Sequence, residues 1–121
     1  MTVVSKMDFR SGCPIATTLD VIGDKWTLVL IRDMLVGKKR YQEFLASPEG
    51  ITTNILANRL KRMEEMGLIR KLLYQQHPPR FDYVLTDLGR SLHPVLQAIC
   101  RWANTQIPNT WTLPASFMAG P

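Results

Sequence analysis

Residues 52–66 combine a regular apolar pattern with amide, guanidinium and ammonium side chains. Leu56, Leu60 and Met63 recur at helical spacing, which predicts a helix with one buried side that ends before Gly67. The other side carries Thr53, Asn54, Ala57, Asn58 and Lys61, with Arg62 at the border. An asparagine can make two hydrogen bonds to adenine, and arginine or lysine can reach guanine acceptors or phosphates. The pattern favours contact with DNA, and the alternative is a solvated helix face.

A predicted β-hairpin follows this helix. Residues 68–74 have strand composition, and residues 75–79 form a tip whose two prolines cannot donate to a ladder. In the second strand, Phe81, Tyr83 and Leu85 alternate with Arg80, Asp82 and Val84, as in a half-buried strand. Arg80 can enter a minor groove or touch a phosphate, or it can be an edge charge that opposes aggregation.

A second basic cluster, residues 38–40, lies just before a short predicted helix at 41–45. Phosphate contacts often come from such loops, although a charged loop can also serve only solubility. Thr52 or Thr53 can cap the helix that follows. The predicted DNA-contacting residues are Lys38, Lys39, Arg40, Thr52, Thr53, Asn54, Asn58, Arg59, Lys61, Arg62 and Arg80.

Composition suits one folded domain. The 121 residues are 45% hydrophobic, and the net charge of +5 with a pI near 9.6 weakly favours a polyanionic partner. Cys13 and Cys100 form no metal-ligand spacing with His77 and His93, and two cysteines make no disulfide scaffold. We therefore expect a cytoplasmic protein without a metal site or cofactor.

Neither an enzyme nor a membrane protein is predicted. The chain has no phosphate-binding glycine loop, nucleophile elbow or clustered carboxylate pair, so we expect no catalytic residue. Residues 1–12 lack the apolar run of a signal peptide. The longest apolar run, 28–31, is far too short to span a membrane.

The remaining helices must position these groups. Pro14 is expected to begin the first helix, and Asp24 to cap a central core helix at 25–36 that is apolar nearly all round. We divide the chain into an N-terminal arm (1–12), one domain (13–107) and a C-terminal tail (108–121) without periodicity, whose apolar side chains can dock on a surface. The fold class is mainly α with a small β-hairpin.

The last helix is predicted from 87 to about 106, with a kink or two abutting helices at Pro94. Its apolar side includes Leu92, Leu96, Ile99 and Trp102. This stripe is too apolar for an isolated surface helix, which predicts a homodimer interface. A two-fold dimer would bind an inverted repeat in double-stranded DNA.

A series of short motifs runs through residues 13–103 in a defined order. They are Cys13-Pro14, Gly23-Asp24-Lys25-Trp26, Gly37 with Arg40-Tyr41, Gly50-Ile51-Thr52, Leu56 to Leu60, Gly67-Leu68-Ile69, Tyr83, Leu85-Thr86, Gly89 and Trp102. Together they resemble the HxlR-type transcriptional regulators, a branch close to the MarR-type regulators. Tyr41 for Phe and Thr52 for Ser are mild departures, and residues 46–49 and the tail are less similar to the family.

The resemblance implies a winged helix-turn-helix fold in a homodimeric bacterial or archaeal DNA-binding regulator. The first and last helices would form the dimer interface. Helix 52–66 would be the recognition helix in the major groove. The hairpin would be the wing, with residues 75–80 on the flanking backbone or in the minor groove.

Cys13 is a candidate redox sensor. The resemblance implies this role because some members respond to oxidants or electrophiles at the matching position. Pro14 places Cys13 at or beside a helix N-cap, where the helix dipole favours a thiolate, and Arg10 can add positive potential. The alternative is a small buried residue. Trp26 and Trp102 are core or interface residues, or they line a small-ligand pocket between the dimerisation helices.

One alternative function stays open. A winged-helix module can bind another protein through the apolar last helix and tail, without any role on DNA. Such a module would not need Asn58, Lys61 and Arg62 beside the basic residues 38–40. The basic surface therefore favours a transcriptional regulator.

Overall fold

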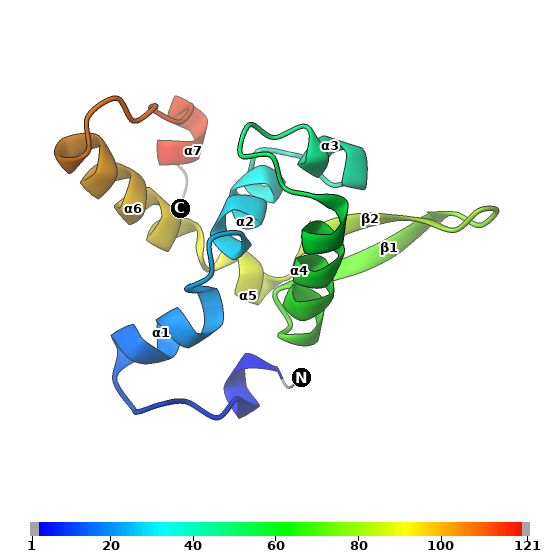
Figure 1. Cartoon of the computed structure of the whole chain (residues 1–121), viewed down its shortest axis with the longest axis horizontal. Coiled ribbons are helices and arrows are strands. Elements are labelled where there is room, and N and C mark those ends of the chain that lie inside the picture. The colour runs from blue at the N-terminus through cyan, green and yellow to red at the C-terminus, as the bar shows by residue number, and fades with distance from the viewer. Residues whose placement is uncertain (1–2, 120–121) are drawn as a thin grey trace.

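The computed structural model describes residues 3–119. Its elements are η1 (Val4–Lys6), α1 (Pro14–Ile22), α2 (Thr27–Leu35), α3 (Tyr41–Leu45), α4 (Thr53–Glu65), β1 (Ile69–Gln75), β2 (Arg80–Leu85), α5 (Asp87–Arg90), α6 (His93–Gln106) and α7 (Ala115–Ala119). The hairpin of β1 and β2 projects at one end, whereas α1, α6 and α7 lie at the other, with α2 and α4 between them (Figure 1). This is the predicted mainly helical architecture with one antiparallel hairpin.

The core is centred on α2, as its apolar sequence predicts. Leu30 and Ile31 are fully buried and share one cluster with Phe44 of α3. The predicted inner stripe of α4 is confirmed, because its Leu56, Leu60 and Met63 are all buried in this cluster. From the arm, the half-buried side chains of Val4, Met7 and Phe9 pack against the same core.

The first two helices differ in how well their starts were predicted. α1 begins at Pro14 as expected, whereas α2 begins at Thr27, two residues after the predicted start. The Asp24 carboxylate accepts hydrogen bonds from the backbone N–H groups of Trp26 and Thr27, both at 3.0 Å. Asp24 therefore supplies the expected cap, but from two residues before the N-cap position, which Trp26 holds.

A glycine turn joins α4 directly to the hairpin. Gly67 has a φ of 83°, a left-handed conformation that favours glycine. Its N–H donates to Glu64 O at 3.0 Å, and the N–H of Leu68 donates to Met63 O at 2.9 Å. Leu68 and Ile69 are each 2% exposed, so the side chains at the end of the turn and at the start of β1 both lie in the core.

The hairpin is held against the loop before α3. In its ladder, Ile69 pairs with Leu85 and Leu73 with Phe81, and the register shifts between Leu73 and Gln75. The predicted alternation in β2 is wrong, because residues 81–84 are all half-buried. The loop before α3 covers β2: the backbone N–H of Tyr83 donates to Lys39 O at 2.7 Å, and the Arg40 side chain pairs with that of Asp82.

The C-terminal region confirms one prediction and corrects another. Two abutting helices, α5 and α6, replace a single helix, and Pro94 lies in the first turn of α6. The tail docks as expected but also forms α7, which the sequence pattern did not predict. Phe117 is 5% exposed, and its carbonyl bonds to His93 Nε2 at 2.8 Å and to Gln97 Nε2 at 3.0 Å.

Candidate nucleic-acid interface

The exposed face of α4 carries Asn54, Asn58 and Lys61, because their spacing of four and three residues matches a helical turn. Thr53 is exposed beside them, and Thr52 is the N-cap, whose hydroxyl oxygen accepts from Ile55 N–H at 3.4 Å. The Asn58 Oδ1 accepts a hydrogen bond from Arg59 Nη1 at 2.8 Å. A two-bond contact between Asn58 and adenine therefore requires this oxygen to accept a second hydrogen bond or to be released by Arg59.

Arg59 and Arg62, two of the predicted DNA contacts, both bind groups of their own chain in this structure. Arg62 donates to the carbonyl oxygens of Val21 and Asp20 at 3.0 and 3.1 Å. Arg59 Nε lies 3.2 Å from an oxygen of the Asp24 carboxylate. Their side chains are 29% and 23% exposed. Arg59 still reaches the open face of α4 through its hydrogen bond to Asn58, whereas the Arg62 guanidinium is directed at the end of α1.

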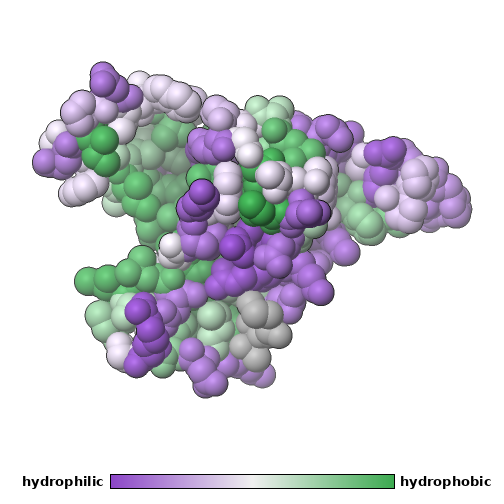
Figure 2. Space-filling model, in the orientation of Figure 1, coloured by the Kyte–Doolittle hydropathy of each residue, from purple (hydrophilic) through white to green (hydrophobic). Residues whose placement is uncertain are grey.

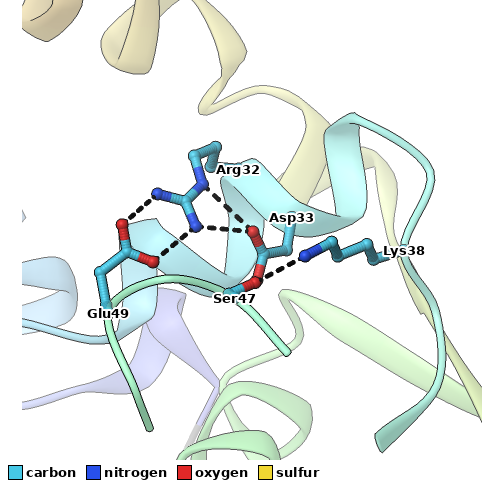
Figure 3. A network of polar contacts seen from close by, with 5 residues as sticks. All are labelled: Arg32, Asp33, Lys38, Ser47 and Glu49. Atoms are coloured by element: carbon cyan, nitrogen blue, oxygen red, sulfur yellow. Dashed lines mark hydrogen bonds and ion pairs between the residues drawn. The ribbon is translucent and has the colours of Figure 1, made fainter. Parts of the chain in front are cut away.

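The basic residues 38–40 also separate into different environments. Lys38 Nζ donates to Ser47 Oγ at 2.7 Å and so points into the protein (Figure 3). Lys39 is 51% exposed, and its Nζ lies 3.7 Å from an Asp82 oxygen. Arg40 is 45% exposed. The structure thus presents Lys39 and Arg40 at the surface but not the ammonium of Lys38.

Arg40 connects the start of α3 to the wing. Its Nε donates to Asp82 Oδ1 at 2.8 Å, and its guanidinium lies 3.9 Å from the ring centroid of Tyr74. The hydrogen bond raises the pKa of the Arg40 guanidinium and lowers that of the Asp82 carboxyl. The cation is therefore partly neutralised in the free protein, and a phosphate must compete with Asp82 for it.

An open groove of about 750 Å³ separates α3 from the hairpin. Its lining includes Lys39, Arg40, Tyr74, Arg80 and Phe81. Arg80, at the tip end of β2, is exposed, as a wing residue that reaches DNA would have to be. The groove therefore combines cationic and aromatic side chains from two elements far apart in the sequence.

A polar network fastens the turn after α3 to α2 (Figure 3). The buried Asp33 carboxylate accepts from Ser47 Oγ at 2.6 Å and from Arg32 at 2.8 Å. Arg32 also makes two hydrogen bonds to Glu49, at 2.7 and 2.8 Å. These bonds raise the pKa of Arg32 and lower that of Glu49. Since Ser47 and Glu49 lie in the turn before α4, the network fixes α3 and α4 relative to the core.

Apolar side chains remain exposed at the end of the molecule opposite the wing. They include Ile15 and Leu19 of α1, at 72% and 54% exposure, and Ile99 and Trp102 of α6, at 47% and 63%. Figure 2 shows hydrophobic surface gathered where α1 faces α6 and α7. Among the other predicted dimer residues, Leu92 is half-buried and Leu96 is 5% exposed in the chain's own core.

The two cysteines have different surroundings. Cys13 is exposed at the N-cap of α1, and its backbone N–H donates to Ser11 Oγ at 3.1 Å. The expected positive potential from Arg10 is offset, because its Nε lies 2.6 Å from an Asp20 oxygen. Cys100 is half-buried, and burial raises the pKa of its thiol.

Sequence reasoning missed the carboxylates that organise the site, above all Asp33 and Asp82. Asp33 carried a usable signal, because a charged residue in a helix that is otherwise apolar must find a partner when buried. Asp82 carried none, since the partner that covers it lies 42 residues away in the sequence.

Within residues 3–119, we find no group of three or more His, Cys, Asp and Glu side chains able to hold a metal ion. No helix in this range is long and apolar enough to cross a membrane.

The helix α3, the turn, the half-exposed helix α4 and the hairpin define a winged helix-turn-helix protein. The model of the HxlR-like helix-turn-helix family matches residues 21–110, and the chain belongs to this family. The HTH-type transcriptional regulator YdeP of Bacillus subtilis strain 168 is 42% identical over 98 residues, which cover 81% of this chain and 76% of YdeP. The chain is therefore an HTH-type transcriptional regulator and not an enzyme.

Solved structures agree with this assignment. The crystal structure of PA1607 superposes with a TM-score of 0.74 at 37% identity and covers 86% of this chain and 73% of its own. The redox regulator HypR in its oxidized form has a TM-score of 0.70 at 38% identity, covering 78% of this chain and 97% of its own. The reduced form of the transcriptional regulator YodB from B. subtilis has a TM-score of 0.67 at 25% identity, covering 84% and 100%.

Proposed function

We propose that this regulator acts as a homodimer on an inverted-repeat operator in chromosomal DNA, and hence in the cytoplasm. α4 enters the major groove of each half-site, and the wing lies on the flanking backbone or in the minor groove. The observation that carries this proposal is the outward face of α4, where two asparagines and a lysine are exposed opposite a fully buried stripe.

The wing and the loop before α3 support a phosphate-binding role beside this face. Arg80, Lys39 and Arg40 are exposed around one open groove, and they come from two elements that flank α4 in the sequence. Cations held at such positions fix the orientation of a protein on the duplex without reading bases. Arg40 contributes once a phosphate displaces Asp82.

The exposed apolar surface supports dimerisation. Ile15, Leu19, Ile99 and Trp102 lie at the end of the molecule away from the wing, so pairing there leaves α4 accessible. Leu92 contributes at the edge of the interface. Leu96 is buried in the chain's own core, so its contribution is to hold α6 in place and not to contact the partner subunit.

We also propose that Cys13 senses oxidants or electrophiles. Its support is an exposed thiol at the N-cap of α1, the helix that carries part of the proposed dimer surface. HypR is a redox regulator of similar fold, and structures of its oxidized and reduced forms both superpose on this chain. A modified side chain at this position could change the separation of the two α4 helices. Cys100 is the contrasting, less reactive thiol.

Selection of binding sites from random duplex DNA tests the main proposal. We expect an inverted repeat with half-site centres about 10 bp apart or a multiple of this, and affinity that falls steeply with salt. Sedimentation should give twice the 13.8 kDa chain mass. A clean monomer at micromolar concentration, or no sequence enrichment, would contradict the proposal and favour a protein-binding module.

The sensor proposal needs a separate measurement. Operator binding is measured before and after diamide, hypochlorite or a quinone, for wild type, Cys13→Ser and Cys100→Ser. We expect wild type and Cys100→Ser to respond alike and Cys13→Ser to be insensitive. An unresponsive wild type, or a Cys13→Ser variant that responds fully, refutes the role of Cys13.

A further inference from the structure

A polar joint connects α4 to the end of α1 and the start of α2. It consists of Arg59 and Arg62 on α4, the Asp24 carboxylate, and the backbone carbonyls of Asp20 and Val21. None of these contacts belongs to the apolar core, and all of them lie on the side of α4 next to its proposed DNA face.

Arg62 acts as a C-terminal cap for α1, although it belongs to a helix 41 residues further along the chain. The last carbonyls of a helix have no partners within the helix, and a cation is favourable there. Arg62 Nη1 reaches Val21 O at 3.0 Å and Nη2 reaches Asp20 O at 3.1 Å. One planar guanidinium thus holds two consecutive carbonyls, which restricts the direction of α1 as well as its position.

Asp24 adds a second connection to the joint. Arg59 Nε lies 3.2 Å from Asp24 Oδ2, and Arg62 Nη1 lies 3.7 Å from Oδ1. Burial alone would raise the pKa of Asp24, but hydrogen bonds from Thr27 and Trp26 and the charge of Arg59 lower it below the ordinary 3.8. The carboxylate therefore remains charged near neutral pH and binds α4 to the turn between α1 and α2.

Apart from the joint, α1 is held by its buried last turn and by Arg10 of the arm, which bonds to the Asp20 carboxylate and to the carbonyl of Ala16. Only its last two residues, Val21 and Ile22, are buried, and Figure 1 shows the helix standing apart from α6 with its final turn nearest the core. Ile15 and Leu19, near the other end, are exposed and belong to the proposed dimer surface. The joint at the last turn therefore links the helix that carries that surface directly to α4.

We propose that Arg62 is a positioning residue that sets the angle between α1 and α4, and thereby the separation of the two recognition helices in the dimer. This inference rests on the proposed function. If α1 is fixed against the partner subunit, any rotation at the joint moves α4 along the DNA. A change of one base pair in half-site separation moves the target by about 3.4 Å, with a rotation around the duplex axis. Arg62 therefore determines which operator spacing is accepted.

The test measures binding as a function of spacing. The half-site selected by wild type is placed in duplexes whose spacers are shorter or longer by one and two base pairs. Wild type, Arg62→Gln, Arg62→Lys and Lys61→Gln are compared. Lys61→Gln is the matched control, because Lys61 is the neighbouring cation but lies on the open face of α4.

We expect the affinity of wild type to fall about tenfold or more when the spacer changes by one base pair, a loss similar to that of one mismatched base pair in a site. Arg62→Gln should reduce this discrimination to about threefold or less while keeping the same half-site bases. Arg62→Lys should fall between them, because lysine keeps the charge but not the two-pronged geometry. Lys61→Gln should weaken binding equally at every spacing and reduce the salt slope by about one.

Two results would overturn the role of Arg62. If Arg62→Gln weakens all spacings in parallel and lowers the salt slope as Lys61→Gln does, Arg62 is a DNA contact. If Arg62→Gln discriminates between spacers as strongly as wild type does, the joint does not determine the accepted operator spacing. Should Arg62→Gln fail to fold, the affinity of Arg62→Lys across the same spacers decides between these outcomes. Absence of specific binding by wild type itself would instead refute the proposed function.

Discussion

The two basic stretches of this chain, residues 38–40 and 59–62, have similar composition but are used in different ways. In the loop before α3, Lys38 enters a buried network, while Lys39 and Arg40 stay exposed beside Asp82 of the wing. In α4, helical rotation places Lys61 on the open face and turns Arg59 and Arg62 toward α1 and α2. Each stretch thus contains both structural cations and cations available to a phosphate. Positive charge alone does not locate a DNA contact.

The largest effect is expected from the network that keeps Lys38 inside. Asp33→Ala should reduce the free energy of unfolding by about 3 kcal/mol or more, because it breaks a buried, hydrogen-bonded charge cluster. Asp33 is 2% exposed and bonds to both Arg32 and Ser47. Urea unfolding at neutral pH measures the change. Lys38→Met is the control, expected to cost about 1 kcal/mol or less because the Ser47–Asp33 bond survives. A loss for Asp33→Ala as small as that for Lys38→Met would contradict the proposed weight of the buried Asp33 cluster.

The open face of α4 gives the next largest effect. Asn58→Ala should weaken operator binding by roughly 1–3 kcal/mol and relax specificity at one base pair. Lys61→Ala should instead weaken binding to all sequences alike. Competition binding with a set of single-base operator variants separates the two behaviours. Unchanged specificity in Asn58→Ala would mean that its carboxamide does not read a base.

The salt dependence of binding compares the two stretches directly. Lys61→Ala should reduce the slope of log K against log salt concentration by about one, whereas Lys38→Met should leave it unchanged. Arg40→Ala should weaken all sequences alike and reduce the slope by at most about one, because Asp82 already neutralises part of its charge. Asp82→Asn should strengthen binding by releasing Arg40. A reduced slope in Lys38→Met would reverse the assignment of the two stretches.

The smallest effect is a dependence of stability on acid. Arg32 lowers the pKa of Glu49 below its ordinary 4.5. A carboxyl with a lowered folded-state pKa contributes stability above its unfolded-state pKa, and this contribution is lost as the pH falls through the folded-state pKa. Glu49→Gln should therefore be less stable than wild type by up to about 1 kcal/mol at neutral pH, since the pair is partly exposed. The difference should begin to shrink as the pH falls below about 4.5 and should vanish only below the lowered folded-state pKa, where the wild-type carboxyl is protonated. A difference that grows in acid would contradict the pairing.

Sequence patterns anticipated the elements better than their contacts. Periodicity placed Leu56, Leu60 and Met63 inside, and the proline at 94 indicated the break between α5 and α6. These features depend on local spacing, which a sequence contains in full. The alternation expected in β2 was wrong because the loop before α3 covers the strand from a distant part of the chain.

The sequence by itself determined the helix-turn-helix order, the hairpin and the polar face of α4, since helix periodicity, proline and glycine act on their own neighbours. Only the tertiary structure decided which cations are available. Arg62 and Lys61 are adjacent in sequence, yet a rotation of about 100° along the helix separates them. Whether each side chain then meets a carboxylate, a free helix end or open solvent depends on the elements packed beside it. Asp24 and the carbonyls of Asp20 and Val21 reach α4 only through the fold.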